Sequence, residues 1–217
     1  MRKVSFVPGE FYHLYNRGNS RQVIYKTDAD YTRFMTLLYI ANGTNSLDFR
    51  RIDQEELFRS ERGEQQVAIG AYCLMPNHFH ILVTPLVEDG VTTFMRKLTT
   101  GYSMYFNKRH LRTGSLFEGR FKSEHADNDN YLKYLFSYIH LNPVKLIQSD
   151  WLKVGIRDKS EALKYLRDYK YSSYIDNDLV RPESGILEKR KFPEYFSSYE
   201  NYEGEMEEWL NFKRDCA

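Results

Sequence analysis

Apolar and aromatic side chains fall into short blocks along the chain, and their spacing predicts the secondary structure. An aromatic-rich run at 11–16, closed by the turn Arg17-Gly18-Asn19, predicts a strand. Two apolar runs at 67–74 and 78–84 predict two further strands, because the turn residues Met75-Pro76-Asn77 separate them.

Three other segments place apolar side chains at helical spacing. Residues 28–41 begin at Asp28, which we predict as the N-cap, and residues 91–110 form a second helix. Residues 129–141 form a third, ending at Asn142-Pro143 because proline disfavours helical geometry in the residue before it. The order strand, helix, strand, strand, helix, helix predicts an α+β fold, with an antiparallel sheet and helices packed on one face.

The rest of the chain shows weaker patterns. Residues 42–66 are polar and charged, which predicts a surface loop with a short helix around 53–60, and residues 114–121 predict a loop or short hairpin. After residue 148 the pattern changes to polar helices and loops. We therefore expect a domain over 1–147 and a mostly helical or irregular C-terminal extension over 148–217.

Composition excludes several classes of protein. The 217 residues include only two cysteines, Cys73 and Cys216, which gives no disulfide framework and favours a reducing compartment. The longest apolar runs fall far short of the about 18 residues that a membrane span needs. The N-terminus lacks the apolar stretch of a secretory signal. We therefore expect a cytoplasmic protein with no membrane partner.

The net charge of +1 conceals an uneven distribution. Residues 1–147 carry 19 basic and 15 acidic side chains, whereas residues 148–217 carry 12 and 15. Within 91–122, cations alternate with aromatic rings, a pattern typical of a nucleic-acid groove and also of a solvated helix face. The basic residues of this stretch are Arg96, Lys97, Lys108, Arg109, Arg112, Arg120 and Lys122.

A pair of histidines, His78 and His80, stands in one predicted strand. Side chains at i and i+2 of a strand share one face and lie roughly 6–7 Å apart, so two imidazoles can converge on one metal ion. A third ligand and an open position would make such a site catalytic. The alternative is two unrelated histidines near a strand end.

A second pair, Tyr138 and Asn142, is four residues apart on a predicted helix and shares one helix face. A tyrosine hydroxyl with a cation or base nearby can act as a nucleophile, and the Asn142 oxygen can complete a metal shell. The alternative is a core tyrosine followed by a helix stop. Tyr131 and Tyr134 are competing candidates for the nucleophile.

Other titratable side chains are weaker candidates. His13, His125 and His140 are more consistent with structural contacts than with metal ligands. Glu118 and Glu124 can hold a metal or act as a base, but no pattern in the sequence fixes their positions.

Four segments in this order resemble the signatures of the single-tyrosine HUH transposases (the IS200-like transposases), and specifically their REP-associated branch. The segments are Tyr12-His13-Leu14-Tyr15-Asn16-Arg17-Gly18-Asn19, Met75-Pro76-Asn77-His78-Phe79-His80-Ile81-Leu82-Val83, Gly114-Ser115-Leu116-Phe117-Glu118-Gly119-Arg120-Phe121 and Tyr138-Ile139-His140-Leu141-Asn142-Pro143-Val144-Lys145. The resemblance covers about residues 8–147 and implies a ferredoxin-like or RRM-like fold.

The resemblance also implies roles for individual residues. It implies that His78 and His80 bind a divalent metal, Mg²⁺ or Mn²⁺, that Asn142 is a further ligand, and that Tyr138 is the nucleophile. Its implied substrate is hairpin-forming single-stranded DNA, cleaved through a 5′-phosphotyrosine link. The basic residues of 91–122, together with Arg17 and Arg21, would then contact the DNA.

Three functions stay open at this point. The first is a DNA strand-transfer enzyme that uses Tyr138. The second is a catalytically silent nucleic-acid-binding module of the same fold, and the third is a metal-dependent nuclease in which water attacks. The resemblance also leaves open whether the chain works as a monomer or a homodimer.

Overall fold

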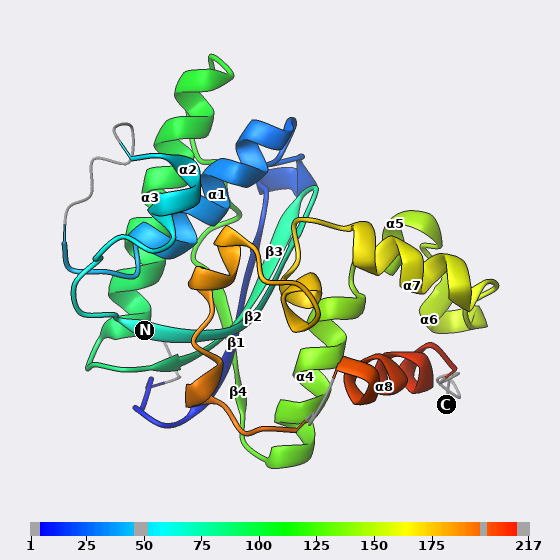
Figure 1. The fold of residues 1–217 in the computed structure, drawn as a ribbon. Helices are drawn as coiled ribbons and strands as arrows, with labels where there is room; N and C mark the ends of the chain where they lie inside the picture. The colour runs from blue at the N-terminus through cyan, green and yellow to red at the C-terminus, as the bar shows by residue number, and fades with distance from the viewer. Residues whose placement is uncertain (1–4, 46–51, 196–198, 212–217) are drawn as a thin grey trace.

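A four-stranded antiparallel sheet forms the centre of the protein (Figure 1). The computed structural model describes residues 5–45, 52–195 and 199–211, so the predicted 42–66 loop falls partly outside the described residues. The sheet has the order β2-β3-β1-β4. Its strands are β1 (Phe11–Arg17), β2 (Val67–Met75), β3 (His78–Pro85) and β4 (Lys122–Ala126).

Helices cover both faces of this sheet, so the prediction that they pack on one face alone is wrong. Helices α1 (Asp28–Ile40) and α3 (Gly90–Arg109) pack on one face, and α4 (Asp129–Leu141) packs on the other, beside α8 in Figure 1. The chain order β1, α1, β2, β3, α3, β4 is that of the ferredoxin-like fold, which confirms the predicted α+β class. No helix in the described part of the chain is both long enough and apolar enough to cross a membrane.

The position of α4 follows from the composition of the central strands. Every residue of β2 is buried, and so is every residue of β3 after His78. Strands whose side chains are apolar on both faces of the sheet need both faces covered. Phe79 and Ile81 therefore lie in the core with α1 and α3, whereas Leu82 lies against α4.

Strand β4 is absent from the sequence-based order of elements. Its sequence, Lys-Ser-Glu-His-Ala, has no apolar alternation, and of its residues only Ala126 is buried. The strand is specified by pairing with β1, from Phe11 opposite Ala126 to Tyr15 opposite Lys122. An edge strand of this kind gives no hydrophobic pattern that can be read locally.

The ends of α1 and α4 are set by capping. The N-cap of α1 is Thr27 rather than Asp28, because Asp30 at the third position completes a capping box with it. Asn128 caps α4 and accepts a hydrogen bond from the Tyr131 amide at 2.8 Å. Helix α4 ends at Leu141, as predicted, so Tyr138 lies in its last turn.

The residues after α4 pack onto the same body. The Leu74 amide donates to the Tyr171 carbonyl at 3.0 Å, and the Glu188 amide donates to the Ile69 carbonyl at 2.9 Å, so this segment covers the free edge of β2. The helices of this segment are α5 (Val144–Ile147), α6 (Trp151–Val154), α7 (Lys159–Asp168) and α8 (Tyr199–Asn211). The remaining helix, α2 (Gln54–Leu57), lies in the 42–66 loop. Short 3-10 turns lie at Asn19–Arg21, Ser173–Asn177, Pro182–Ile186 and Lys189–Lys191.

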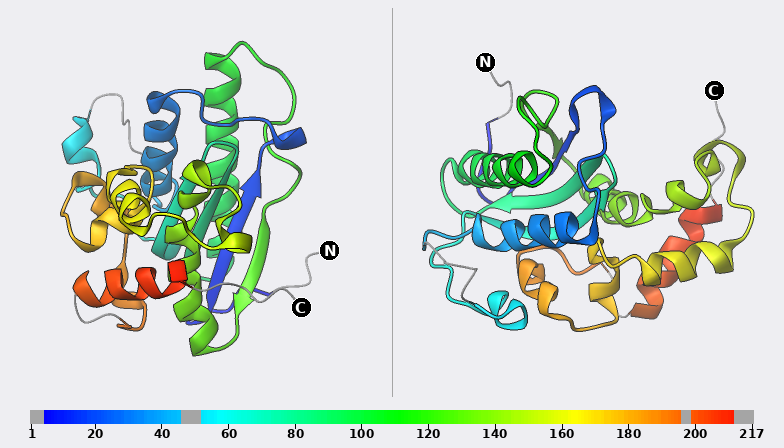
Figure 2. Two further views of the ribbon diagram at one scale, coloured as in Figure 1. Left: turned by 90° about the vertical axis from the view of Figure 1, so that its right-hand side faces the viewer. Right: turned by 90° about the horizontal axis from the view of Figure 1, so that it is seen from above.

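Helix α8 lies beside α4, as both views of Figure 2 show. The Tyr202 hydroxyl bonds to the buried His140 ring, and Lys133 pairs with Glu205 at 2.8 Å. These contacts attach the C-terminal segment to the helix that carries Tyr138.

Candidate active site

The register of β1 and β3 places the two histidines on the face that α4 covers. Arg17 is opposite His78, and Tyr15 is opposite His80. Phe79 points to the other face and is fully buried. The polar end of this face therefore carries both predicted histidines next to a cation and a tyrosine.

The two imidazoles are adjacent and each is held through Nδ1. Their ring centroids are 5.0 Å apart. The Nδ1 of His78 lies 2.7 Å from Asn77 Oδ1, and the Nδ1 of His80 lies 2.8 Å from the Nε2 of His13. Because Nδ1 of each ring is used in these contacts, the Nε2 atoms are the ones that can bind a ligand.

Burial keeps both rings neutral. It lowers the pKa of His78 to about 4, with a smaller contribution from the charge of Lys145, and lowers the pKa of His80 well below its usual value. A neutral imidazole has the lone pair that metal coordination requires.

Helix α4 brings Tyr138 against this pair. The Tyr138 ring centroid lies 5.5 Å from that of His80 and 5.8 Å from that of His13, edge-on in both cases. Tyr134, one turn earlier, lies 5.7 Å from Tyr138, whereas the Tyr131 hydroxyl donates to Glu124 at 3.1 Å. Of the three candidate tyrosines on α4, Tyr138 is the one in ring contact with His80.

Asn142 lies one turn beyond Tyr138 and is almost completely buried. Its Nδ2 donates to the Tyr138 carbonyl at 2.8 Å, and its Oδ1 accepts a hydrogen bond from Lys145 Nζ at 3.0 Å. The Lys145 ammonium also lies 5.5 Å from the Tyr138 ring centroid. The sequence reasoning missed Lys145, although it stands one turn after Asn142 in the quoted motif.

A metal at this site would have few protein ligands. Among the described residues, no group of three or more His, Cys, Asp or Glu side chains is arranged to hold a metal ion. His78 and His80 fit a divalent cation through two neutral nitrogens, and the remaining positions would fall to oxygens. Asn142, phosphate oxygens and water are chemically suitable for Mg²⁺ or Mn²⁺.

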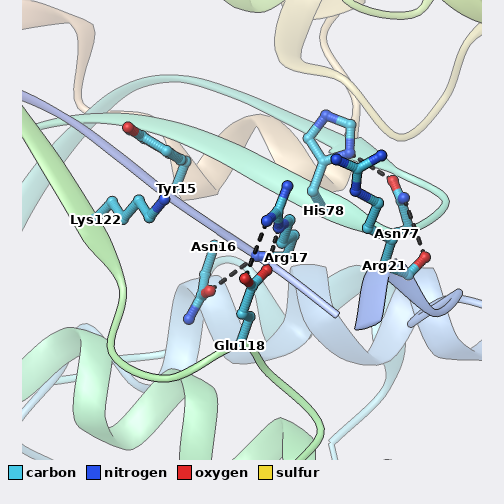
Figure 3. A pocket seen from close by; sticks show the side chains of 8 residues that line it. All are labelled: Tyr15, Asn16, Arg17, Arg21, Asn77, His78, Glu118 and Lys122. Atoms are coloured by element: carbon cyan, nitrogen blue, oxygen red, sulfur yellow. Dashed lines mark hydrogen bonds and ion pairs between the residues drawn. The ribbon is translucent and has the colours of Figure 1, made fainter. Parts of the chain in front are cut away.

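A pocket of about 360 Å³ opens beside His78 (Figure 3). Arg17 pairs with Glu118 on one side of it. On the other side, the Asn77 side chain bonds to the backbone carbonyl of Arg21 at 3.3 Å and holds the chain next to His78. The pocket is lined by β1 and the 3-10 turn after it, by the β2–β3 turn and the first residue of β3, and by the loop before β4 and the first residue of β4. The lining residues are Tyr15, Asn16, Arg17, Arg21, Asn77, His78, Glu118 and Lys122.

A larger groove of about 790 Å³ lies between α3 and the loop that precedes β4. Arg96 and Arg120 line it together with hydroxyl side chains of α3, and Asn16 lines both this groove and the pocket. Asn16, near the end of β1, is the lining residue that the groove and the pocket share.

The structure separates six of the seven basic residues of 91–122 into two sets of three. Arg96 and Arg120 line the groove, and Lys122 lines the pocket. The other set is engaged within the protein: Lys97 donates to the Gly43 carbonyl, Arg109 pairs with Asp30, and Arg112 bonds to Asn107. Lys108 is exposed near the end of α3.

The weaker candidates take different positions. His140 is buried between Tyr202 and Ser173, away from the site, and His125 pairs with Glu10 on the other face of the sheet. His13, by contrast, lies directly beside His80 and Tyr138, and Glu124 lies on the far side of His13, 3.7 Å from its Nδ1. Their spacing in the sequence gives no signal of this, because strand pairing alone brings them together.

Part of this chain matches a known protein family. Residues 46–142 match the family model described as "Transposase IS200 like". The resemblance to the IS200-like transposases is confirmed. The matched segment contains both histidines, Tyr138 and Asn142.

A solved structure is similar to this chain over most of its length. It is a REP-associated tyrosine transposase bound to a REP hairpin, with 14% sequence identity and a TM-score of 0.51. The similarity covers 82% of this chain and 84% of that chain, and at this identity it shows a shared fold. No curated protein is significantly similar to this chain in sequence.

Proposed function

We propose that this protein is a metal-dependent strand transferase that acts on hairpin-forming single-stranded DNA and uses Tyr138 as its nucleophile. The observation that carries the proposal is the contact between Tyr138 and His80, at 5.5 Å between ring centroids. This contact joins the predicted nucleophile to a predicted metal ligand.

The proposed reaction balances without water. The Tyr138 oxygen forms a bond to the phosphorus of the scissile phosphodiester, and the bond to the 3′ oxygen breaks. The phenol proton passes to solvent, and the departing 3′ oxygen takes up a proton from solvent to become a hydroxyl. The product is a 5′-phosphotyrosine link that a 3′-hydroxyl can later attack, so the bond energy is conserved for rejoining.

Residues of this chain prepare that step. Lys145 places a positive charge 5.5 Å from the Tyr138 ring, where it stabilises negative charge as the hydroxyl loses its proton. Asn142 holds Lys145 in place through a 3.0 Å hydrogen bond. Leu135 and Ile139, buried against the sheet, fix the helix that carries Tyr138.

His78 and His80 would hold the metal through their Nε2 atoms, and Asn142 would add the second lone pair of its amide oxygen, since the first accepts the Lys145 hydrogen bond. A bound divalent cation supplies Lewis-acid polarisation of a non-bridging phosphate oxygen. Tyr138 approaches His80 within one chain, so this pair needs no second subunit, and a homodimer stays a prediction.

The pocket and groove provide a route for the DNA. Arg21 and Lys122 would bind backbone phosphates in the pocket next to His78, and Arg96 and Arg120 would bind those in the groove. Hairpin DNA is proposed as the substrate because the structurally similar REP-associated transposase is bound to a hairpin.

The decisive experiment looks for a covalent adduct. The protein is incubated with Mn²⁺ and 3′-labelled hairpin oligonucleotides whose single-stranded flanks are randomised. We expect a labelled band that survives denaturation with the wild type and disappears with Tyr138→Phe. Tyr134→Phe, one turn away on the same helix, is the matched control and should retain the band.

Two other outcomes would contradict the proposal. Binding of the hairpins without any cleavage would favour a catalytically silent nucleic-acid-binding module. Cleavage that persists in Tyr138→Phe would favour a nuclease in which water attacks.

A further inference from the structure

Three polar side chains form a line across the sheet behind the predicted metal site. Glu124 on β4 is directly opposite His13 on β1. His13 Nε2 lies 2.8 Å from His80 Nδ1, and the two rings are nearly parallel, at 20°. On the other side, Glu124 Oε2 lies 3.7 Å from His13 Nδ1. His13 is therefore between a carboxylate and the buried His80.

The carboxylate is held in this position from two directions. The Tyr15 hydroxyl donates to Glu124 Oε1 at 2.8 Å, and the Tyr131 hydroxyl donates to Oε2 at 3.1 Å. The neighbouring His13 ring makes the largest contribution to lowering the pKa of Glu124 to about 2, so the carboxyl group is ionised. Tyr131 lies on α4, the helix that also carries Tyr138.

The single proton between the two histidines can belong to either ring. In one arrangement His80 Nδ1–H donates to His13 Nε2, and His13 then carries its other proton on Nδ1, facing the Glu124 carboxylate. In the reverse arrangement His13 Nε2–H donates to His80, and a bare Nδ1 lone pair faces the carboxylate. The negative charge disfavours the reverse arrangement and favours the first.

This choice decides whether His80 can bind a metal. A neutral imidazole protonated on Nδ1 has its lone pair on Nε2, whereas the reverse tautomer has a proton there. His13 Nδ1 is buried and has no hydrogen-bond partner within standard distance among the described residues, so Glu124 at 3.7 Å is the nearby acceptor toward which it is directed.

A different contact gives His78 the same tautomer, with its proton on Nδ1. The Asn77 Nδ2 donates to the Arg21 carbonyl at 3.3 Å, which turns Oδ1 toward His78. The carboxamide oxygen then accepts from His78 Nδ1–H at 2.7 Å, leaving the Nε2 lone pair of His78 available. In both histidines the Nε2 lone pair is therefore available to bind a metal ion.

We propose that Glu124 and His13 are positioning residues that fix the tautomer of His80, so that its Nε2 is ready to bind the metal. The proposal rests on the proposed function in one respect, namely that His80 is a metal ligand. Partners of this kind orient metal-binding histidines and raise their basicity.

The first test reads the tautomer directly in the metal-free protein. Two-bond ¹⁵N–¹H correlation spectra distinguish Nδ1–H from Nε2–H imidazoles. We expect His80 to be protonated on Nδ1 in the wild type and to shift toward the Nε2–H form in Glu124→Gln. Glu10→Gln is the matched control, because Glu10 pairs with His125 at 2.7 Å on the other face of the sheet and should leave His80 unchanged.

The second test measures Mn²⁺ affinity from the electron paramagnetic resonance signal of free Mn²⁺. We expect His13→Leu to weaken binding by at least about tenfold, as removal of a partner behind a metal ligand does. His13→Gln, whose amide oxygen can accept from His80 Nδ1–H, should recover most of the affinity. Glu124→Gln, at a half-exposed position that tolerates substitution, should weaken binding less than His13→Leu does.

The outcomes separate this proposal from the proposed function. An Nε2–H tautomer of His80 in the wild type, or Glu124 and His13 variants with unchanged tautomer and affinity, would overturn the positioning role while leaving Tyr138 chemistry intact. Unchanged Mn²⁺ affinity in His80→Ala would overturn the metal site itself, and with it both proposals.

Discussion

The ring of Tyr138 stands edge-on to the ring of His80, with the centroids 5.5 Å apart and the planes at 83°. The two residues belong to elements far apart in the chain, the last turn of α4 and the start of β3. The contact exists because α4 covers the face of the sheet opposite to α1 and α3. A helix on the same face as α1 would leave Tyr138 remote from both histidines.

Replacement of Lys145 should slow the chemical step rather than weaken DNA binding. We expect Lys145→Met to lower the rate of adduct formation by about 10²-fold, because it removes the charge that lies 5.5 Å from the Tyr138 ring. Lys145→Arg keeps a cation and should retain part of the rate. Single-turnover rates at saturating Mn²⁺ and DNA measure the effect, and an unchanged rate in Lys145→Met would refute this role.

Cations in the pocket beside His78 should contribute to affinity for DNA of any sequence. We expect the double variant Arg21→Ala/Lys122→Ala to bind single-stranded hairpins more weakly, and the slope of log affinity against log salt to fall by about one for each phosphate that is no longer neutralised. The control replaces an exposed lysine on α7, Lys164→Ala, which changes net charge away from the pocket. Fluorescence anisotropy at several salt concentrations gives both quantities, and equal slopes for all three proteins would contradict the assignment.

Asp30 should stabilise the fold in a pH-dependent way. Its carboxylate is fully buried and accepts hydrogen bonds from the Thr27 amide at 3.0 Å and from His110 at 3.1 Å. Burial acts to raise the pKa of Asp30, but these hydrogen bonds outweigh burial and lower it. We expect Asp30→Asn to cost about 1–3 kcal/mol at pH 7.

The sign of the pH effect follows from that lowered pKa. Because the pKa of Asp30 is lower in the folded than in the unfolded protein, its contribution is present above the unfolded value of about 3.9 and is lost as the pH falls through the folded value. Urea unfolding of wild type and Asp30→Asn should therefore give a difference that shrinks below about pH 4. A difference that grows on acidification would contradict the prediction.

The contact between α8 and α4 should contribute measurably to stability. The Tyr202 hydroxyl bonds to His140 Nδ1, and His140 Nε2 bonds to Ser173 at 2.7 Å, all of them buried. We expect Tyr202→Phe to cost about 1–3 kcal/mol, because it leaves a buried ring nitrogen without a partner. Urea unfolding tests this against Tyr165→Phe, a half-buried tyrosine on α7, and equal destabilisation of the two variants would argue against the specific contact.

Local sequence patterns determined several features of this protein. The turn at Pro76-Asn77 fixes where β3 begins. Pro143 fixes where α4 ends because it has no amide hydrogen to continue the helical hydrogen bonds, although Asn142 before it keeps helical dihedral angles. Strand alternation places His78 and His80 on one face, and helical periodicity places Asn142 one turn after Tyr138. The order of these motifs was sufficient to recognise the IS200-like resemblance.

The tertiary structure alone decided which side chains meet across the sheet. Strand β4 has no apolar pattern of its own, so only pairing with β1 brings Glu124 opposite His13, whose ring separates the carboxylate from His80. The same pairing and packing divide the basic residues, because Arg109 is drawn to the buried Asp30 while Lys122 lines the pocket. Backbone geometry acts over a few residues and can be read from the sequence, whereas sheet order and packing join residues far apart and leave no local signal.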